Sequence, residues 1–237
     1  MADSYRILVV DDEPQMTRAL GLNLKALGYR VDAASSGEEA LRQAADHRPD
    51  AVILDLGLPG IDGIDVIRGL RGWTQVPIIV LSVRDAESVK IAALDAGADD
   101  YVTKPFGMGE LLARLRAALR REVDPPDDLP KVETGDFTID LASKRATRRS
   151  GEEIRLTPTE WGIVEMLVRH EGKLVTQSLL LKEVWGPNYG EETNYLRVFM
   201  AQIRRKLEPE PSAPRYFITE PGMGYRFERG QQLNDDR

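Results

Sequence analysis

Several side chains that can do chemistry follow short apolar segments in the first half of this 237-residue chain. They are Asp11, Asp12, Glu13, Asp55, Ser82 and Lys104. Carboxylates that lie close together repel one another, and some must take up protons unless a cation neutralises them. Oxygen ligands of this kind suit Mg²⁺, which also keeps places for water and phosphate oxygens. A carboxylate can also attack phosphorus to form an aspartyl phosphate, while a lysine and a metal ion stabilise the transferred charge.

The apolar segments before these side chains are too short for helices and rich in valine and isoleucine, which is typical of buried strands. Five strands are predicted, at 7–10, 30–34, 51–54, 78–81 and 100–102. Helical periodicity separates them near 14–27, 37–46, 63–71, 87–96 and 109–121. This alternation predicts an α/β domain with a doubly wound, five-stranded parallel sheet. Because such sheets bind ligands beyond the carboxyl ends of their strands, the reactive side chains are expected at one rim.

Each of these acids on its own has a simpler interpretation, as a helix N-cap or a solvated loop residue. Asp62 and Asp65 are interpreted in this way. For the strand-end residues taken together the simpler interpretation is poor, because carboxylates, a hydroxyl and an ammonium group all follow matching strand ends. The sequence therefore favours a binding or reaction site there.

The composition narrows the possible chemistry. Cysteine is absent and there are 2 histidines, which excludes disulfides, a thiol nucleophile, thiolate metal ligands and a histidine-rich metal site. Neither a signal peptide nor an apolar run of the ~18 residues that span a bilayer is recognisable. We therefore expect a cytoplasmic protein without a membrane partner.

The sequence changes character at residues 122–130, EVDPPDDLP, whose prolines and acids oppose both helix and sheet. The segment is interpreted as a linker, although a long surface loop within one domain is the alternative. We predict a first domain at 1–121, a second at 131–230 and a tail at 231–237. The second domain is predicted to have strands at 137–140 and 153–155, helices from Thr157, at 177–185 and at 192–208, and a final hairpin at 216–219 and 225–227. Thr157, Pro158 and Glu160 have the spacing of a capping box.

The helix predicted at 192–208 combines an apolar stripe with a basic surface. The stripe consists of Leu196, Met200, Ile203 and Leu207. The chain has a net charge of -7, yet this helix has four basic residues and no acid between Thr193 and Leu207. Such a helix can enter the major groove of DNA, where arginine reads guanine and asparagine reads adenine. It can equally be an ordinary amphipathic helix with a basic outer face, and the helix alone leaves both interpretations open.

Four stretches of the first half, VVDDE, ILDLGLPGIDG, PIIVLS and AGADDYVTKPF, resemble the receiver domain of response regulators. The resemblance covers residues 5–121 and implies a flavodoxin-like fold and a sensor histidine kinase as partner. The implied site residues are Asp55 as phosphoacceptor, Asp11, Asp12, Asp55 and the Gly57 carbonyl as Mg²⁺ ligands, and Ser82, Tyr101 and Lys104 as groups that contact or follow the phosphoryl group. The bond before Pro105 is expected to be cis. A receiver is not a conventional enzyme, since it promotes only its own phosphoryl transfer and slow dephosphorylation.

Val83 departs from this family pattern, because a small residue usually follows the hydroxyl at the position of Ser82. A branched side chain at the mouth of the pocket is expected to slow access of the phosphodonor or hydrolysis. The departure affects the rates and leaves the site itself in place.

A further set of residues has the mixed charge of a self-complementary surface. It consists of Lys90, Ile91, Leu94, Asp99, Asp100, Glu110, Leu112 and Arg114. In a generic protein these residues would form a solvated face. Here they resemble the symmetric dimer face of the OmpR/PhoB subfamily, which implies a homodimer that phosphorylation stabilises.

The second half resembles the winged helix-turn-helix domain of the same subfamily in LTPTEWGIVEMLV, GKLVTQSLLLKEVWG, YLRVFMAQIRRKLE and FITEPGMGYRF. The resemblance covers residues 131–228, makes the helix at 192–208 the recognition helix and makes the last hairpin the wing. The implied DNA contacts are Asn194, Arg197, Ala201, Arg204, Arg205, Lys206 and Arg226. Promoter DNA is the implied partner, with RNA polymerase as a possible second one. Other stretches, among them VWGPN and KPFGMGELLARLR, resemble the branch that regulates potassium transport, although no side-chain chemistry specifies potassium.

Two other classes of function are weaker. A Mg²⁺-dependent phosphatase would use the same pocket, but Gly57 stands where a second acid would follow Asp55, and no separate substrate-binding domain is present. A nucleotide-binding domain would need a glycine-rich fingerprint that the chain lacks. An acid-stable, base-labile label on the intact protein would favour the regulator, whereas steady release of product would favour an enzyme.

Overall fold

The computed structural model describes residues 5–83, 86–119, 131–186, 189 and 193–230. The chain divides into two compact units, Met1–Arg120 and Arg121–Arg237. The predicted linker at 122–130 and the tail at 231–237 lie outside the described residues, so both stay predictions.

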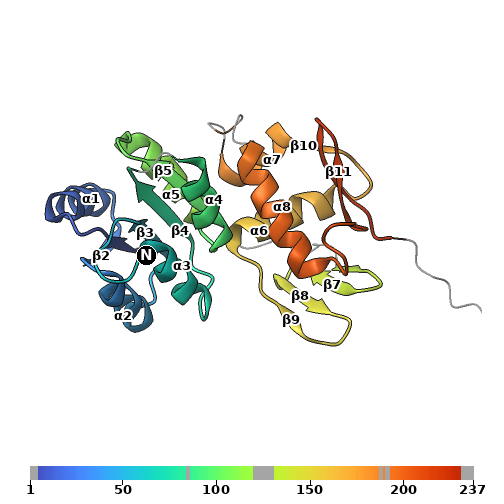
Figure 1. Cartoon of the computed structure of the whole chain (residues 1–237), viewed down its shortest axis with the longest axis horizontal. Helices are drawn as coiled ribbons and strands as arrows, with labels where there is room; N and C mark the ends of the chain where they lie inside the picture. The colour runs from blue at the N-terminus through green and yellow to red at the C-terminus, as the bar shows by residue number, and fades with distance from the viewer. Residues whose placement is uncertain (1–4, 84–85, 120–130, 187–188, 190–192, 231–237) are drawn as a thin grey trace, which may run out of the picture. The chain divides into compact units, whose positions relative to one another are not determined.

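The N-terminal unit is built on one sheet of five parallel strands (Figure 1). The strands are β1 (Arg6–Val10), β2 (Arg30–Ala34), β3 (Ala51–Asp55), β4 (Ile78–Ser82) and β5 (Asp100–Thr103). Their order is β2-β1-β3-β4-β5, so the direction of winding reverses between β1 and β3. β3 and β4 are buried along their whole length, as strands covered on both faces must be. The predicted doubly wound parallel sheet is therefore confirmed.

Five helices connect these strands (Figure 1). They are α1 (Pro14–Ala26), α2 (Gly37–His47), α3 (Gly63–Arg71), α4 (Glu87–Asp95) and α5 (Met108–Leu119). Leu20 and Leu24 of α1 form a core cluster with Leu111 and Leu115 of α5 and with Ile53 of β3, so α1 and α5 share one face of the sheet. On the other side α2 packs against α3, and α3 against α4. Asp62 caps α3 by accepting from the backbone N–H of Ile64 at 2.8 Å, as the sequence predicted.

The start of α3 is packed tightly against the end of β3. A Cβ added to Gly63 would lie 2.6 Å from the Leu56 Cα and 2.8 Å from the carbonyl oxygen of Asp55. Only glycine fits between these backbone atoms without a shift. The loop after Asp55 is thereby held against the helix that follows it.

A buried arginine ties the second half of the sheet together. Arg71, at the end of α3, donates to the carbonyl oxygens of Val76 at 2.7 Å and Gly97 at 2.9 Å, and its Nη2 lies 2.7 Å from Asp99 Oδ2. The same Asp99 oxygen accepts from the backbone N–H of Ile78 at 3.0 Å. Such a pair is stable in the interior only when further hydrogen bonds satisfy both groups, and here they do. The starts of β4 and β5 are fixed to α3 as a result.

The C-terminal unit contains two antiparallel sheets and three described helices (Figure 1). The strands are β6 (Lys131–Glu133), β7 (Phe137–Asp140), β8 (Arg145–Arg148), β9 (Glu153–Ile154), β10 (Val175–Thr176), β11 (Phe217–Glu220) and β12 (Gly224–Phe227). The helices are α6 (Pro158–Arg169), α7 (Gln177–Trp185) and α8 (Thr193–Leu207). The strand orders are β6-β7-β8-β9 and β10-β12-β11.

The predicted capping box of α6 is confirmed, because the Thr157 hydroxyl accepts from the Glu160 N–H and the Glu160 carboxylate accepts from the Thr157 N–H. The helices and the final hairpin agree with the sequence analysis to within about two residues. Three short strands, β6, β8 and β10, were not predicted. Among the described residues no helix is both long and apolar enough to span a bilayer.

Candidate functional site

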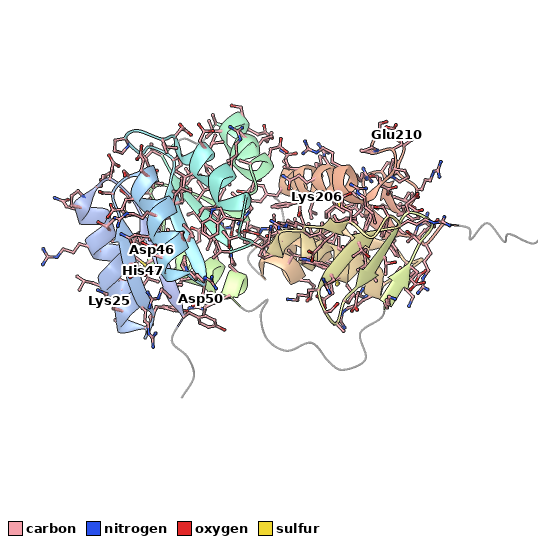
Figure 2. The ribbon with its side chains drawn as sticks, turned by 90° about the horizontal axis from the view of Figure 1, so that it is seen from below. Lys25, Asp46, His47, Asp50, Lys206 and Glu210 are labelled. Carbon is pink, nitrogen blue, oxygen red and sulfur yellow. The ribbon has the colours of Figure 1, made fainter. Side chains whose placement is uncertain are left out.

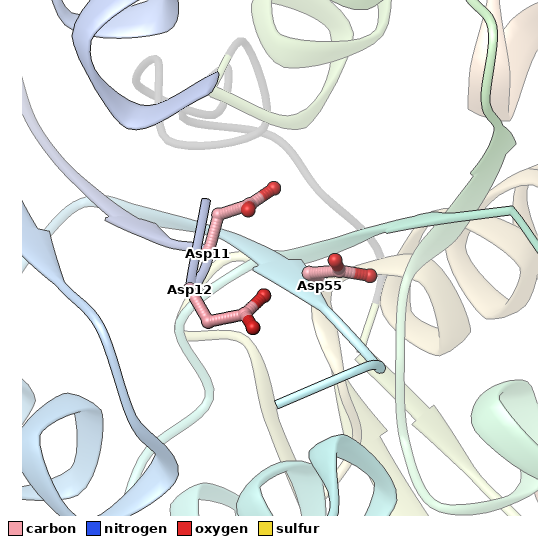
Figure 3. A group of neighbouring side chains, drawn as sticks. All are labelled: Asp11, Asp12 and Asp55. Carbon is pink, nitrogen blue, oxygen red and sulfur yellow. The ribbon is translucent and has the colours of Figure 1, made fainter. Parts of the chain in front are cut away.

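Three carboxylates converge at the carboxyl ends of β1 and β3 (Figure 3). Asp11, Asp12 and Asp55 each offer one oxygen, and these oxygens all lie within 4.8 Å of one another. Asp11 and Asp55 are buried, while Asp12 is exposed. Backbone N–H groups orient the two buried carboxylates, since Glu13 donates to Asp11 Oδ1 at 2.9 Å and Gly57 donates to Asp55 Oδ1 at 3.3 Å. The predicted rim of strand-end carboxylates therefore exists.

Lys104 follows β5 and reaches into the same rim. Its Nζ donates to Asp11 Oδ2 and to Asp55 Oδ2, at 2.9 Å in each case. Burial alone would lower the pKa of this ammonium, but the hydrogen bonds to the two carboxylates and their charge raise the pKa above its ordinary value. The backbone N–H of Lys104 donates to the Ser82 carbonyl oxygen at 2.7 Å, and the Lys104–Pro105 bond is cis as expected. One buried cation thus offsets part of the negative charge of the pocket.

The carboxylates of the pocket suit a hard divalent cation. All the candidate side-chain ligands are oxygens, and no cysteine is available to bind a softer metal. The exposed position of Asp12 leaves one side of the cluster open to solvent, where water or phosphate oxygens can complete a coordination shell. The residues present therefore fit Mg²⁺.

The predicted switch residues lie on β4 and β5, the two strands that follow β3 in the sheet order. Ser82 is the last residue of β4 and is buried, and Tyr101 is buried in β5. Lys90 of α4 lies with its Nζ 5.7 Å from the centroid of the Tyr101 ring. Val83, which directly follows Ser82, has 72% of its surface exposed. Most of this residue is therefore in contact with solvent.

The residues predicted for a dimer face have several different environments. Ile91 is an exposed apolar residue at 37%, while Leu94 and Asp99 are buried and Leu112 is partly buried. Three of the charged residues are linked by ion pairs, since Arg114 lies 3.1 Å from an oxygen of Asp100 and 2.6 Å from an oxygen of Glu110. Asp99 is engaged within the receiver, where it pairs with Arg71 and accepts from the backbone N–H of Ile78.

Helix α8 has the two faces that the sequence predicted. The apolar stripe is buried, with Leu196 and Ile203 fully inaccessible to solvent. The opposite face consists of Asn194, Arg197, Ala201 and Arg205, all exposed and spaced three or four residues apart. No acidic side chain occurs within the helix. This face can approach a polyanion.

Three other predicted contact residues have partners inside the C-terminal unit. Arg204 donates to the Phe217 carbonyl oxygen and to the Thr219 hydroxyl. Lys206, labelled in Figure 2, donates to Oε2 of the buried Glu160 at 2.6 Å. The partners of Arg226 are the carboxylates of Glu220, at 2.6 Å, and Glu228, at 3.2 Å.

Glu208 is a buried acid that the sequence analysis left without a role. Its carboxylate accepts from the backbone N–H groups of Arg215 at 2.8 Å, Tyr216 at 2.9 Å and Phe217 at 2.7 Å. The only sequence signal is an acid directly after a basic helix, and its partners are known only once the chain has folded back.

Comparison with known proteins identifies both halves of the chain. Residues 7–116 match the family described as response regulator receiver domain, and residues 151–227 match transcriptional regulatory protein, C terminal. Over 223 residues the chain is 61% identical to the transcriptional regulatory protein KdpE of Mycobacterium tuberculosis (strain ATCC 25618 / H37Rv), covering 94% of this chain and 98% of that one. Over 221 residues it is 52% identical to the KDP operon transcriptional regulatory protein KdpE of Escherichia coli (strain K12), covering 93% and 98%.

Solved structures agree with these matches. A RitR mutant, C128D, superposes with a TM-score of 0.78 at 26% identity and covers 96% of this chain and 100% of that one. The response regulator DrrB, an OmpR/PhoB homolog of Thermotoga maritima, gives a TM-score of 0.51 at 30% identity and covers 95% and 99%. The chain therefore belongs to the response regulators of the OmpR/PhoB subfamily, in which a receiver domain precedes a winged-helix DNA-binding domain, and it is similar to KdpE along almost its whole length.

Proposed function

We propose that this protein is a transcription regulator switched by phosphorylation of Asp55. The observation that carries the proposal is the buried Asp55 carboxylate, which lies beside Asp11 and Asp12 and accepts a hydrogen bond from Lys104. No other described residues outside this trio form a comparable acidic cluster. The phosphodonor is a sensor histidine kinase of the KdpD type, as the resemblance implies, and the protein acts in the cytoplasm.

In the phosphoryl transfer, an oxygen of Asp55 attacks the phosphorus atom of the donor. The new O–P bond forms as the bond between phosphorus and the donor atom breaks, and the donor leaves with the electron pair and takes up a proton. Asp11, Asp12, Asp55 and the Gly57 carbonyl would hold Mg²⁺, which when bound neutralises the charge on the transferred oxygens. Lys104 gives up its hydrogen bond to Asp55 and turns to a phosphoryl oxygen.

The signal then leaves the pocket through Ser82 and Tyr101, as the resemblance to receiver domains implies. The hydroxyl of Ser82 turns to the phosphoryl group and the ring of Tyr101 follows, which favours a symmetric homodimer through the face that contains Ile91. In the dimer, two copies of the exposed face of α8 bind promoter DNA. The regulated genes are those of potassium transport, and RNA polymerase is a further partner. The receiver has no substrate beyond its own carboxylate, so the protein is not a conventional enzyme.

Intact-mass measurement with a small-molecule phosphodonor and Mg²⁺ tests this function. Wild type should gain one phosphoryl group, whereas Asp55→Ala should gain none. Asp65→Ala is the matched control, because Asp65 is an exposed acid that pairs with Arg68 on the helix surface, and it should be labelled like wild type. A label that persists in Asp55→Ala, or steady release of phosphate without a labelled protein, would rule the proposal out.

A further inference from the structure

Recognition helix α8 is tied to strand β11 by two side chains that lie one turn apart. Arg204 Nε donates to the Phe217 carbonyl oxygen at 2.9 Å, and Arg204 Nη2 donates to the same oxygen and, at 2.7 Å, to the Thr219 hydroxyl. Glu208 accepts from the N–H groups of Tyr216 and Phe217. Helix α8 and the residue that directly follows it thus contact both polar groups of the Phe217 backbone, so this strand has little freedom to move along or away from α8.

The hairpin of β11 and β12 is the wing, so the constraint on β11 extends to β12 through the pairing of the two strands. Thr219 lies opposite Tyr225 in the antiparallel ladder, and Ile218 lies opposite Arg226. Side chains alternate across a strand, so Phe217, Thr219 and Tyr225 share the face turned to the helix while Arg226 projects from the other face. The position of Arg226 relative to α8 therefore depends on the contact that Arg204 makes.

The chemistry of arginine suits this contact. A guanidinium presents several N–H groups in one rigid plane, and two of them meet a single carbonyl oxygen while one also meets a hydroxyl. A lysine has one nitrogen at the end of a flexible chain and cannot reproduce both contacts. Burial lowers the pKa of Arg204 from its ordinary value, which reflects a group turned into the protein rather than toward solvent.

We infer that Arg204 is a positioning residue, which sets the wing hairpin against the recognition helix so that both elements engage one DNA duplex together. The inference rests on the proposed function. It separates Arg204 from its neighbour Arg205, which lies on the exposed face of α8 with Arg197 and contacts DNA directly. Sequence alone gives the two arginines the same expected role, and the contacts of Arg204 distinguish them.

The test uses the full-length protein and four variants: Arg204→Lys, Thr219→Val, the double variant of these two, and Arg205→Ala. The probe is a duplex that the wild-type protein selects from a random-sequence library. Affinity, its salt dependence and hydroxyl-radical protection are measured at a temperature at which circular dichroism shows each variant to be fully folded.

Both single variants should weaken binding on the order of tenfold and should lose protection in the half of the footprint that the wing covers. The double variant should be no weaker than Arg204→Lys alone, because Arg204→Lys already breaks the contact with Thr219. Thr219→Val should weaken binding and reduce the wing protection without a change of charge. In contrast, Arg205→Ala should keep the wing protection and flatten the salt dependence by about one phosphate contact.

Three outcomes would overturn the inference. Wild-type protection in a folded Arg204→Lys variant would show that the contact only stabilises the domain. Additive losses in the double variant would show that Arg204 and Thr219 contact DNA separately, as would an effect of Arg204→Lys confined to one base pair. If instead the wild-type protein selects no duplex at any salt concentration, the proposed function itself is wrong, and the inference fails with it.

Discussion

Lys104 decides how the pocket behaves when no cation is bound. Its ammonium lies 2.9 Å from a carboxylate oxygen of Asp11 and 2.9 Å from one of Asp55. The Lys104 side chain itself is only 7% exposed. Removing one partner of a buried, hydrogen-bonded charge cluster leaves the charges of the others uncompensated, which lowers the free energy of unfolding by about 3 kcal/mol. A divalent cation can supply the same neutralisation. A bound cation and the Lys104 ammonium therefore both reduce the repulsion between the same carboxylates.

Replacing Lys104 by Met should lower the free energy of unfolding in EDTA, and added Mg²⁺ should restore more stability to the variant than to wild type. The raised pKa of Lys104 fixes the pH range of this effect. The stabilisation is complete below the ordinary pKa of 10.5 and is lost as the pH rises through the higher folded value. Denaturant titrations at several pH values measure it. An unchanged difference between wild type and variant above that pH would contradict the argument.

Val83 offers a second prediction at the scale of one residue. The residue is 72% exposed and directly follows Ser82, and we expect it to stand where a phosphodonor approaches. Val83→Ala should raise the rate of labelling by a small phosphodonor by about threefold, since ~0.7 kcal/mol of steric hindrance is removed. Quench-flow labelling followed by intact mass measures the rate. A rate equal to that of wild type would show that the branched side chain does not obstruct the donor.

At the scale of the elements, the receiver strands and helices were predictable because apolar runs rich in valine and isoleucine alternate with segments of helical period, so most elements carry a local signal. Strands β6, β8 and β10 were missed for the opposite reason. Each has only two to four residues, and β8 reads as a polar turn until β7 and β9 pair with its two edges. Such strands depend on tertiary pairing rather than on local preference.

The same contrast applies to the candidate site. Asp11, Asp55 and Lys104 could be placed at one rim because the topology of a parallel sheet brings strand ends together. The different roles of Arg204 and Arg205 could not be predicted from the sequence. Helical periodicity gives the direction of the Cα–Cβ bond and not the partner of a long, flexible side chain. Buried Glu160 was predicted as a cap, but its ion pair with Lys206 joins residues far apart in the sequence.

The glycine that begins α3 gives a prediction for an element. Gly63→Ala should destabilise the receiver by about 1–3 kcal/mol, because its Cβ would overlap the backbone of Leu56 and Asp55. Gly109→Ala is the matched control, since nothing lies within 4 Å of its Cβ and alanine favours the helix. Denaturant unfolding of both variants should give opposite signs. A Gly63 variant as stable as wild type would mean that the loop after Asp55 moves easily.

At the scale of the whole molecule, charge is unevenly distributed. The chain carries a net charge of -7, which by itself would weaken binding to a polyanion. The exposed face of α8 nevertheless carries Arg197 and Arg205 with no acidic neighbour in the helix. Association with DNA should therefore depend on this local face and on the number of faces presented together, which makes a dimer far more effective than a monomer.

The expected dimer is tested through Ile91, an exposed apolar residue of α4. Ile91→Asp should keep the phosphorylated protein monomeric in sedimentation velocity, because a charge would be desolvated in an apolar contact. Leu22→Asp, at an exposed apolar position of α1, should dimerise like wild type. Intact mass must show equal phosphorylation of all three proteins. Equal dimerisation of the Ile91 variant would place the contact elsewhere.

The pairing of β10 with β12 also has a consequence for protein synthesis. Val175 pairs with Tyr225, although α7, α8 and β11 lie between them along the chain. On the ribosome the receiver is translated before the C-terminal unit, whereas β10 can form its pair only after β12 has also been translated. A chain truncated before Gly224 would keep every basic residue of α8 and lose the strand that closes its sheet. Such a product is expected to accept a phosphoryl group from the kinase without binding the promoter. It would therefore compete with the untruncated protein for phosphorylation.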